Sequence, residues 1–168
     1  AGGKPEPGIY RRAGELVGAQ NPLAVGDRLE TDIMGAVAAG VPALHVLTGV
    51  HQARDVIRAP RGQRPTYLAI DMRGLLEAHP APKHHRDGTW TCGVSQVAKA
   101  TRSGVLTLDD VELTEPVTIS IDSYRALAAA AWEYADGAGT PVTCPEITVV
   151  DNEDPAGIVS QPEPVAAA

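Results

Sequence analysis

Three charged side chains in the first part of the chain, Lys4, Asp27 and Asp32, have the types and spacing of a metal and phosphate site. Asp27 follows the apolar run at residues 23–25 and one glycine, and Asp32 comes five residues later. Two carboxylates that converge repel each other unless a cation lies between them, and carboxylate oxygens suit Mg²⁺. Lys4 adds a compact positive charge before a predicted helix start, where backbone N–H groups also attract anions. The combination predicts a site for a metal-bound phosphate group.

The same residues also fit a turn that has no chemistry. A Gly-Asp pair after a strand is common in structural turns, and a lone Lys-Pro pair is less specific still. Spacing alone therefore leaves both interpretations open, a structural turn and a catalytic site.

The elements that must position these residues alternate between helix and strand. Apolar spacing predicts a helix between Pro7 and Gly18, a second helix capped by Thr31 and ended by Gly40, and further helices at 52–58 and 72–78. Predicted strands cover residues 23–25, 43–47 and 67–70. This order indicates an α/β fold with parallel, crossover-connected strands, and ligands of such sheets gather at the carboxyl ends of the strands.

Three stretches, in this order, resemble the closing half of the haloacid dehalogenase superfamily core. They are Gly-Lys-Pro-Glu-Pro at residues 3–7, Val-Gly-Asp-Arg-Leu-Glu-Thr-Asp-Ile at 25–33, and Val-Leu-Thr-Gly-Val at 46–50, with Gly35 and Ala39-Gly40 between the last two. The resemblance is to the phosphoglycolate- and p-nitrophenylphosphatase-like branch, the NagD-type enzymes. It is dense over residues 2–50 and thins out to about Leu76. The implied fold is half of a Rossmann-like parallel sheet with its helices.

The resemblance implies a role for each charged residue of the site. Lys4 would stabilise a phosphorylated aspartate, Asp27 would ligate Mg²⁺, and Asp32 would orient the lysine or a metal-bound water. Supporting positions of the same motif are Gly26, Arg28 and Thr31.

The family mechanism also needs residues that this sequence does not contain. An aspartate attacks phosphorus to form an aspartyl-phosphate, and an aspartate two residues on acts as acid and base. The Asp-x-Asp-Gly-Thr motif that holds this pair, a Ser or Thr phosphate ligand, and the cap domain do not appear. Asp87-Gly88-Thr89 follows His85-Arg86 rather than an apolar strand, so we reject it as a remnant of the motif. We therefore expect the chain alone to be inactive, with the nucleophile in a missing amino-terminal half, in the same protein or in a separate chain.

The resemblance implies a complete protein that hydrolyses a small phosphomonoester, glycerol 3-phosphate first and 2-phosphoglycolate next. The absent cap sets substrate choice in this family, so the sequence does not decide between them. The missing first strand would lie beside the strand that ends at Asp27, and an unpaired edge favours aggregation. The purified chain alone is thus expected to be insoluble or molten. The alternative is a non-catalytic fragment or a regulatory or dimerisation module.

Composition excludes several classes of partner. The net charge of −7 and the pI near 5.1 argue against nucleic acid and anionic lipid. No apolar run of about 18 residues predicts a membrane span, and no signal-peptide pattern opens the chain. The two cysteines are too few for a disulfide scaffold, which favours a reducing, cytoplasmic location. A homodimer remains possible.

The chain divides by composition into a core half at residues 1–80, a linker at 81–86, a small α+β appendage at 87–159, and a disordered tail at 160–168. The appendage carries predicted strands at 89–97, 117–121 and 147–150, and a strand or turn at 105–111. Its helix is expected to begin at a Ser123 cap and to cover residues 124–135.

Other candidate sites in the chain are weak. His84, His85 and Cys92 match no zinc spacing and fit a solvated linker. Cys92 and Cys144 lie in separate predicted strands and could touch, but a reducing compartment disfavours a disulfide. His45 fits a core histidine with a satisfied ring nitrogen. The remaining aromatic candidates are expected to be packing groups; they are Trp90, Tyr124, Trp132 and Tyr134.

Some actinobacterial members of this branch carry an extension similar to half an acetyltransferase. Residues 134–139 have the glycines of a coenzyme A loop, but Tyr134 stands where Arg or Gln belongs. They also end a predicted helix instead of starting one, so a regulatory or dimerising module is the better interpretation.

Overall fold

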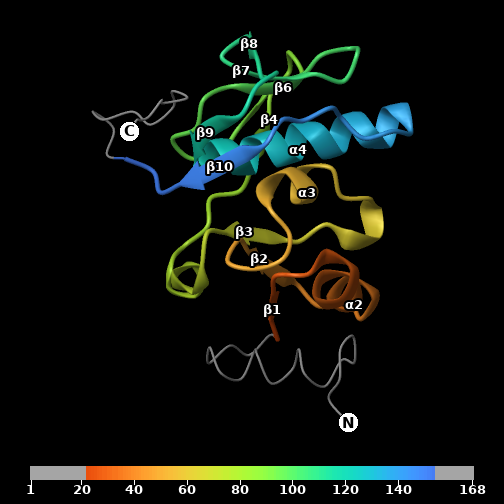
Figure 1. Ribbon diagram of the computed structural model, residues 1–168, viewed down its shortest axis with the longest axis vertical. Helices are drawn as coiled ribbons and strands as arrows, with labels where there is room; N and C mark the ends of the chain where they lie inside the picture. Colours follow the sequence, from red (N-terminus) through yellow and green to blue (C-terminus); the bar gives the residue numbers. More distant parts are fainter. Residues whose placement is uncertain (1–21, 154–168) are drawn as a thin grey trace. The chain divides into compact units, whose positions relative to one another are not determined.

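The computed structural model describes residues 22–153, which form two compact units (Figure 1). The first unit holds the described residues as far as Gln52, and then Ala59–His79. The second holds Ala53–Arg58 and the described residues from Pro80 onward. Lys4, the predicted helix after Pro7 and the predicted tail at 160–168 lie outside the described residues.

A parallel three-stranded sheet is the centre of the first unit. Its strands lie in the order β1 (Ala24–Gly26), β2 (Ala43–Val46) and β3 (Tyr67–Ala69). All four residues of the central strand β2 are buried, as expected for a parallel strand covered on both faces. The core cluster contains Leu44, Val46 and Ala69, with Leu23, Val25 and Leu75 packed against it. The predicted parallel α/β fold is confirmed.

Short helical segments connect and follow these strands. They are η1 (Leu29–Ile33), a π-helical turn, then α2 (Met34–Ala38), and the 3₁₀ turns η2 (Arg61–Gln63) and η3 (Met72–Leu76). Gly40 has a φ of +71° just after α2, the left-handed conformation that lets glycine end a helix. The helix predicted at residues 72–78 was too long, because the structure has only the 3₁₀ turn η3 there.

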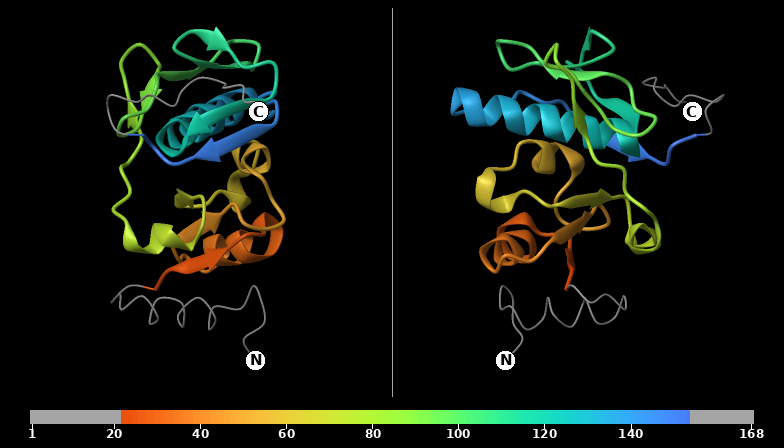
Figure 2. Two further views of the ribbon diagram at one scale, coloured as in Figure 1. Left: turned by 60° about the vertical axis from the view of Figure 1, so that its left-hand side comes forward. Right: turned by 180° about the vertical axis from the view of Figure 1, so that it is seen from behind.

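An antiparallel sheet and one long helix form most of the second unit (Figure 2). The sheet consists, in order, of β4 (Lys83–His84), β5 (Trp90–Thr91), β6 (Ala98–Ala100), β7 (Leu106–Leu108) and β8 (Val111–Glu112). The helix α4 (Ile121–Ala138) packs against β5, β6 and β7. An α+β appendage is thereby confirmed, and residues 83–84 of the predicted linker pair with β5. The single strand predicted at 89–97 is also wrong, because Gly93 has a φ of +56° and separates β5 from β6.

Helix α4 connects the parallel strands β9 (Val117–Ser120) and β10 (Ile147–Val150). The helix begins three residues earlier than predicted, because Ser120 rather than Ser123 is the cap. Ser120 Oγ accepts a hydrogen bond from Ser123 N at 3.1 Å, and Ser123 Oγ instead accepts one from Gln96 N at 3.1 Å. Gly139, with a φ of +77°, ends the helix.

The short helix α3 (Ala53–Ile57) belongs to the second unit, although β2 and β3 of the first unit flank it in sequence. Its residues Ala53, Val56 and Ile57 are fully buried. Trp132 Nε1 in α4 donates a hydrogen bond to Val56 O at 3.0 Å, and Arg54 Nε donates one to Cys144 O at 2.6 Å. Residues Ala53–Arg58 therefore belong to the second unit, although they precede residue 80. The predicted domain division at residue 80 stays a prediction.

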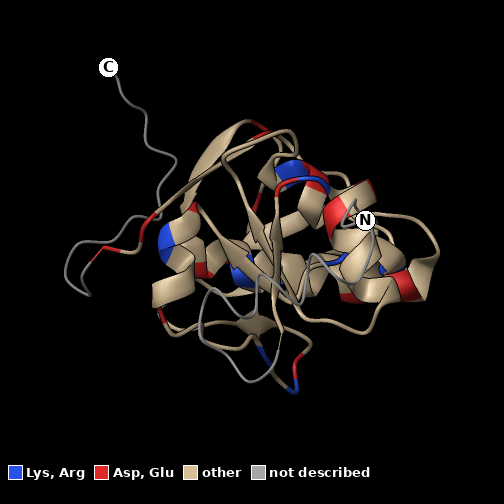
Figure 3. Ribbon diagram, turned by 90° about the horizontal axis from the view of Figure 1, so that it is seen from below, with Lys and Arg blue, Asp and Glu red and all other residues tan. Residues whose placement is uncertain are grey.

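Lys and Arg positions are scattered along the ribbon with Asp and Glu positions among them (Figure 3). Within residues 22–153, none of the helices combines the length and the apolar composition needed to cross a membrane.

Candidate functional site

Asp27 lies where β1 ends, at the carboxyl edge of the parallel sheet. Gly26, the last residue of β1, is in register with His45 of β2. The loop after β2 approaches Asp27 from the side, since a Cβ added at Gly49 would overlap the Asp27 carboxylate. This is the edge at which open parallel sheets bind ligands.

Asp32 points back to the same turn. Its Oδ2 accepts hydrogen bonds from the backbone N–H groups of Asp27 and Arg28, both at 3.1 Å. The side chain is buried, and a Cβ on Gly26 would collide with it. The glycine of the Gly-Asp motif is therefore needed because Asp32 occupies the space of its missing side chain.

The turn between the two aspartates differs from the predicted helix start. Thr31 was expected to cap the second helix, but the helical turn begins at Leu29, with Arg28 at the cap position in an extended conformation. Ile33 N bonds Arg28 O at 3.1 Å, five residues back, which makes the turn a π-turn. Asp32 satisfies the N–H groups ahead of the turn, so Thr31 is not required as a cap.

Within residues 22–153, the fold does not use the carboxylate of Asp27 for a hydrogen bond or an ion pair. Asp27 is partly buried. An oxygen ligand held at a sheet edge, and not paired with a neighbour, fits a hard cation such as Mg²⁺. The Asp27 carboxylate could thus supply one ligand of a magnesium site, which the other side chains of residues 22–153 do not complete.

His45 supports the turn from inside the sheet. This side chain is fully buried, and its Nε2 lies 3.2 Å from Asp27 O. Burial lowers the pKa of His45, so the ring is neutral and Nε2–H donates to that carbonyl. The prediction of a core histidine with a satisfied ring nitrogen is confirmed, but its link to Asp27 was not anticipated.

The other predicted site residues have different surroundings. Arg28 is exposed and contributes its backbone N–H to Asp32, and Thr31 is half-buried within the π-turn. Lys4 lies outside the described residues, so the convergence of all three charged groups stays a prediction. Asp27 and Asp32 do meet in one turn.

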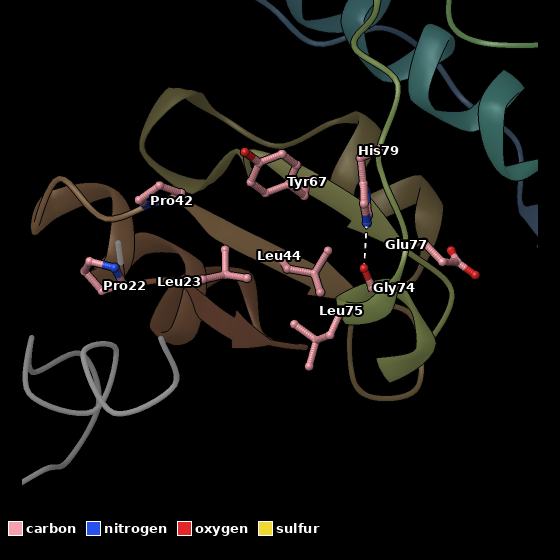
Figure 4. A pocket seen from close by; sticks show the side chains of 9 residues that line it. All are labelled: Pro22, Leu23, Pro42, Leu44, Tyr67, Gly74, Leu75, Glu77 and His79. Atoms are coloured by element: carbon pink, nitrogen blue, oxygen red, sulfur yellow. Dashed lines mark hydrogen bonds between the residues drawn. The ribbon is translucent and has the colours of Figure 1, made fainter. Parts of the chain in front are cut away.

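An open groove of about 450 Å³ lies elsewhere in the first unit (Figure 4). Its walls are about equally polar and apolar and include Leu23, Leu44, Leu75 and Tyr67, and His79 Nε2 is bonded to Gly74 O at 2.8 Å. Pro22 and Pro42, just before β1 and β2, line it as well. The groove is thus near the amino ends of the strands, and Asp27 does not line it.

The weaker candidates behave as structural groups. Cys92 and Cys144 are buried free thiols, and no cluster of three or more His, Cys, Asp or Glu side chains within residues 22–153 could hold a metal. Asp87 Oδ1 accepts hydrogen bonds from Thr89 N and Oγ1 in an exposed turn, not at a strand end. Residues 134–138 form the end of α4, which runs three residues further than the predicted end at Ala135, and they do not start a helix as a coenzyme A loop would.

The chain is similar to a family of hydrolases and to two kinds of phosphatase. A model of the HAD-hydrolase-like family matches residues 1–75. The D-glycerol 3-phosphate phosphatase of Mycobacterium tuberculosis is 37% identical over 131 residues, which cover 78% of this chain and 36% of that protein. Acid sugar phosphatases of Staphylococcus aureus are 39% identical over 76 residues, 44% of this chain and 29% of theirs. The chain thus spans about a third of the length of these relatives.

Among solved structures, a glycerol phosphate phosphatase of Mycobacterium tuberculosis in complex with magnesium aligns with 89% of this chain and 40% of its own. The sequence identity is 30% and the TM-score is 0.48.

Proposed function

Because residues 1–75 belong to the HAD-like hydrolase family, we propose that the complete protein is a Mg²⁺-dependent phosphatase of a small phosphomonoester. One observation carries the proposal: Asp32 holds the turn, while within residues 22–153 the Asp27 carboxylate at the sheet edge makes no hydrogen bond or ion pair. These different surroundings of the two aspartates support Asp27 as the magnesium ligand and Asp32 as the residue that orients Asp27. Lys4 would bind the phosphoryl oxygens.

Each group of this chain then has a limited task. The Asp27 carboxylate supplies one oxygen to the cation, and the Lys4 ammonium offsets negative charge on the transferring group. Asp32 keeps the Asp27 and Arg28 N–H groups fixed, so the ligand does not have to reorganise during turnover. Bound Mg²⁺ would supply Lewis-acid stabilisation of the phosphoryl oxygens.

The nucleophile must come from residues that this chain does not contain. In the described sheet β1 is an edge strand, with β2 on one side only. We infer that the strand with the nucleophilic aspartate pairs with the other side of β1, next to Asp27. The chain alone is then inactive, and its partner is the missing amino-terminal half.

Glycerol 3-phosphate is the first candidate substrate, in line with the name of the mycobacterial relative, and 2-phosphoglycolate is the second. A cytoplasmic location, a possible homodimer, and the absence of nucleic-acid and membrane partners remain parts of the proposal.

The test is Asp27→Asn in the complete protein. The change removes the charge but keeps the size of the side chain, so Mg²⁺-dependent release of phosphate from glycerol 3-phosphate should fall by at least about 1000-fold. Asp110→Asn, the same change at an exposed residue of the second unit, is the matched control and should leave activity unaltered. Unchanged activity of Asp27→Asn would remove Asp27 from the site.

A further inference from the structure

His51 contacts the turn between Asp27 and Asp32 at three points. Its ring Nδ1 accepts a hydrogen bond from Leu29 N at 3.0 Å, and its backbone N donates one to Asp27 O at 3.4 Å. Its Nε2 lies 3.3 Å from Glu30 Oε1. One residue of the loop after β2, 22 positions from Leu29 in sequence, therefore contacts three residues of this turn.

These contacts specify the tautomer of the ring. Since Nδ1 accepts the Leu29 N–H, the ring proton is on Nε2, where it can be donated to Glu30. One tautomer of the ring thus makes both contacts. Asn could replace Nδ1 with its amide oxygen, whereas Gln would place its amide near Nε2.

Together, His51, Asp32 and His45 bond to four polar backbone groups at the start of the turn. Asp32 accepts from the N–H groups of Asp27 and Arg28, and His51 accepts from that of Leu29. The carbonyl oxygen of Asp27 accepts hydrogen bonds from His45 Nε2 and His51 N. The backbone on both sides of the Asp27 Cα is held, and its carboxylate is the group that these bonds leave available.

We propose that His51 is a positioning residue that holds the Asp27 turn so that the carboxylate meets the cation in one orientation. The inference rests on the proposed function. His51 is the informative residue, because its side chain is only 21% exposed yet lies in a loop, whereas His45 is fully buried in β2. Truncation of His45 would leave a cavity in the sheet, but truncation of His51 mainly removes hydrogen bonds to the turn.

The experiment measures Mg²⁺ binding to the complete, substrate-free protein by titration calorimetry. His51→Ala should weaken Mg²⁺ affinity by about tenfold, at the low end of the effect of removing a group that orients a metal ligand. At saturating Mg²⁺, kcat should stay within about threefold of the parent value, because the cation then restores the turn. His51→Asn should recover most of the affinity, and His51→Gln should recover less.

His79→Ala is the matched control. Like the His51 ring, the His79 ring forms a hydrogen bond to a backbone group of the first unit, but that group is Gly74 O and not part of the Asp27 turn. His79→Ala should bind Mg²⁺ like the parent protein. Equal losses in the His51 and His79 variants, or equal affinities of His51→Asn and His51→Gln, would overturn the positioning role. If Asp27→Asn loses Mg²⁺ while His51→Ala binds normally, the proposed function stands and this inference fails. If the parent protein binds no Mg²⁺, the proposed function itself fails.

Discussion

At the scale of the residue, the site depends on glycines that make room for carboxylates. Gly49 does not have a positive φ, so alanine is permitted by its backbone, but a Cβ there would overlap the Asp27 carboxylate. Gly49→Ala in the complete protein should therefore fold and yet displace Asp27. Because misplacement by about 1 Å can cost roughly 100-fold, we expect phosphatase activity to fall by about that factor.

Gly62→Ala is the control for this prediction. Gly62 lies in the same unit, in η2, and an added Cβ there would meet nothing within 4 Å. Activity and thermal melting should match the parent protein. If Gly49→Ala is as active as Gly62→Ala, the Asp27 carboxylate does not act from the position described here.

The two cysteines give a second prediction at this scale. Burial raises the pKa of Cys92 and of Cys144 from 9.0 to about 11. A thiol with a raised pKa has less thiolate at a given pH, so at pH 8 the folded state should hold roughly 100-fold less reactive thiolate than the unfolded state. Alkylation of the complete protein by iodoacetamide, followed by mass spectrometry of each cysteine, should be at least that much slower without urea. Equal rates with and without urea would contradict the burial of these thiols.

The sequence identified Asp27 and Asp32 at residue scale, but not their surroundings. Both aspartates occur in a motif of fixed spacing, so they were found without a structure. His51 and His45 were not assigned to the site, because their contacts with Leu29 and Asp27 join residues 22 and 18 positions apart. Such contacts depend on which strands are neighbours, and the spacing of residues along the chain does not show this.

At the scale of the element, strands with a clear apolar pattern were predicted, and very short ones were not. Strands β1, β2, β3, β9 and β10 all match predicted apolar runs. Strand β4 has two residues, which is too short for an alternating pattern to be visible. The start of α4 was missed because two serines, Ser120 and Ser123, are both good caps, and tertiary contacts decide between them.

The capping assignment is testable. Ser120→Ala removes the acceptor for Ser123 N at the start of α4, and N-cap serines contribute about 1 kcal/mol to stability. We expect the free energy of unfolding, measured with urea on the complete protein, to drop by roughly this amount. Ser103→Ala, at an exposed serine outside the helices, should change it by less than about 0.5 kcal/mol. A loss no larger than that of Ser103→Ala would mean that the cap does not stabilise α4.

At the scale of the whole molecule, chain order does not coincide with the compact units. Helix α3 is encoded between two strands of the first unit, but its buried face and its bond to Trp132 belong to the second. Apolar spacing predicted the helix but could not say which unit would cover it. The same applies to β1, whose sequence predicts a buried parallel strand but not the neighbour at its other edge.

That open edge leads to the last prediction. Strand β1 has a partner on one side only in the described sheet, and unpaired edges of apolar parallel strands promote association. The purified chain alone should be insoluble, or should lack a cooperative thermal transition and bind the dye ANS. Co-expression with the segment that carries the nucleophilic aspartate should restore a sharp melt and phosphatase activity together. Asp27→Asn in the co-expressed chain should restore the melt without the activity, because the strand still pairs but the cation ligand is lost. A sharp, cooperative melt of the chain by itself would show that β1 needs no further strand, and would separate the stability of this half from the chemistry proposed for it.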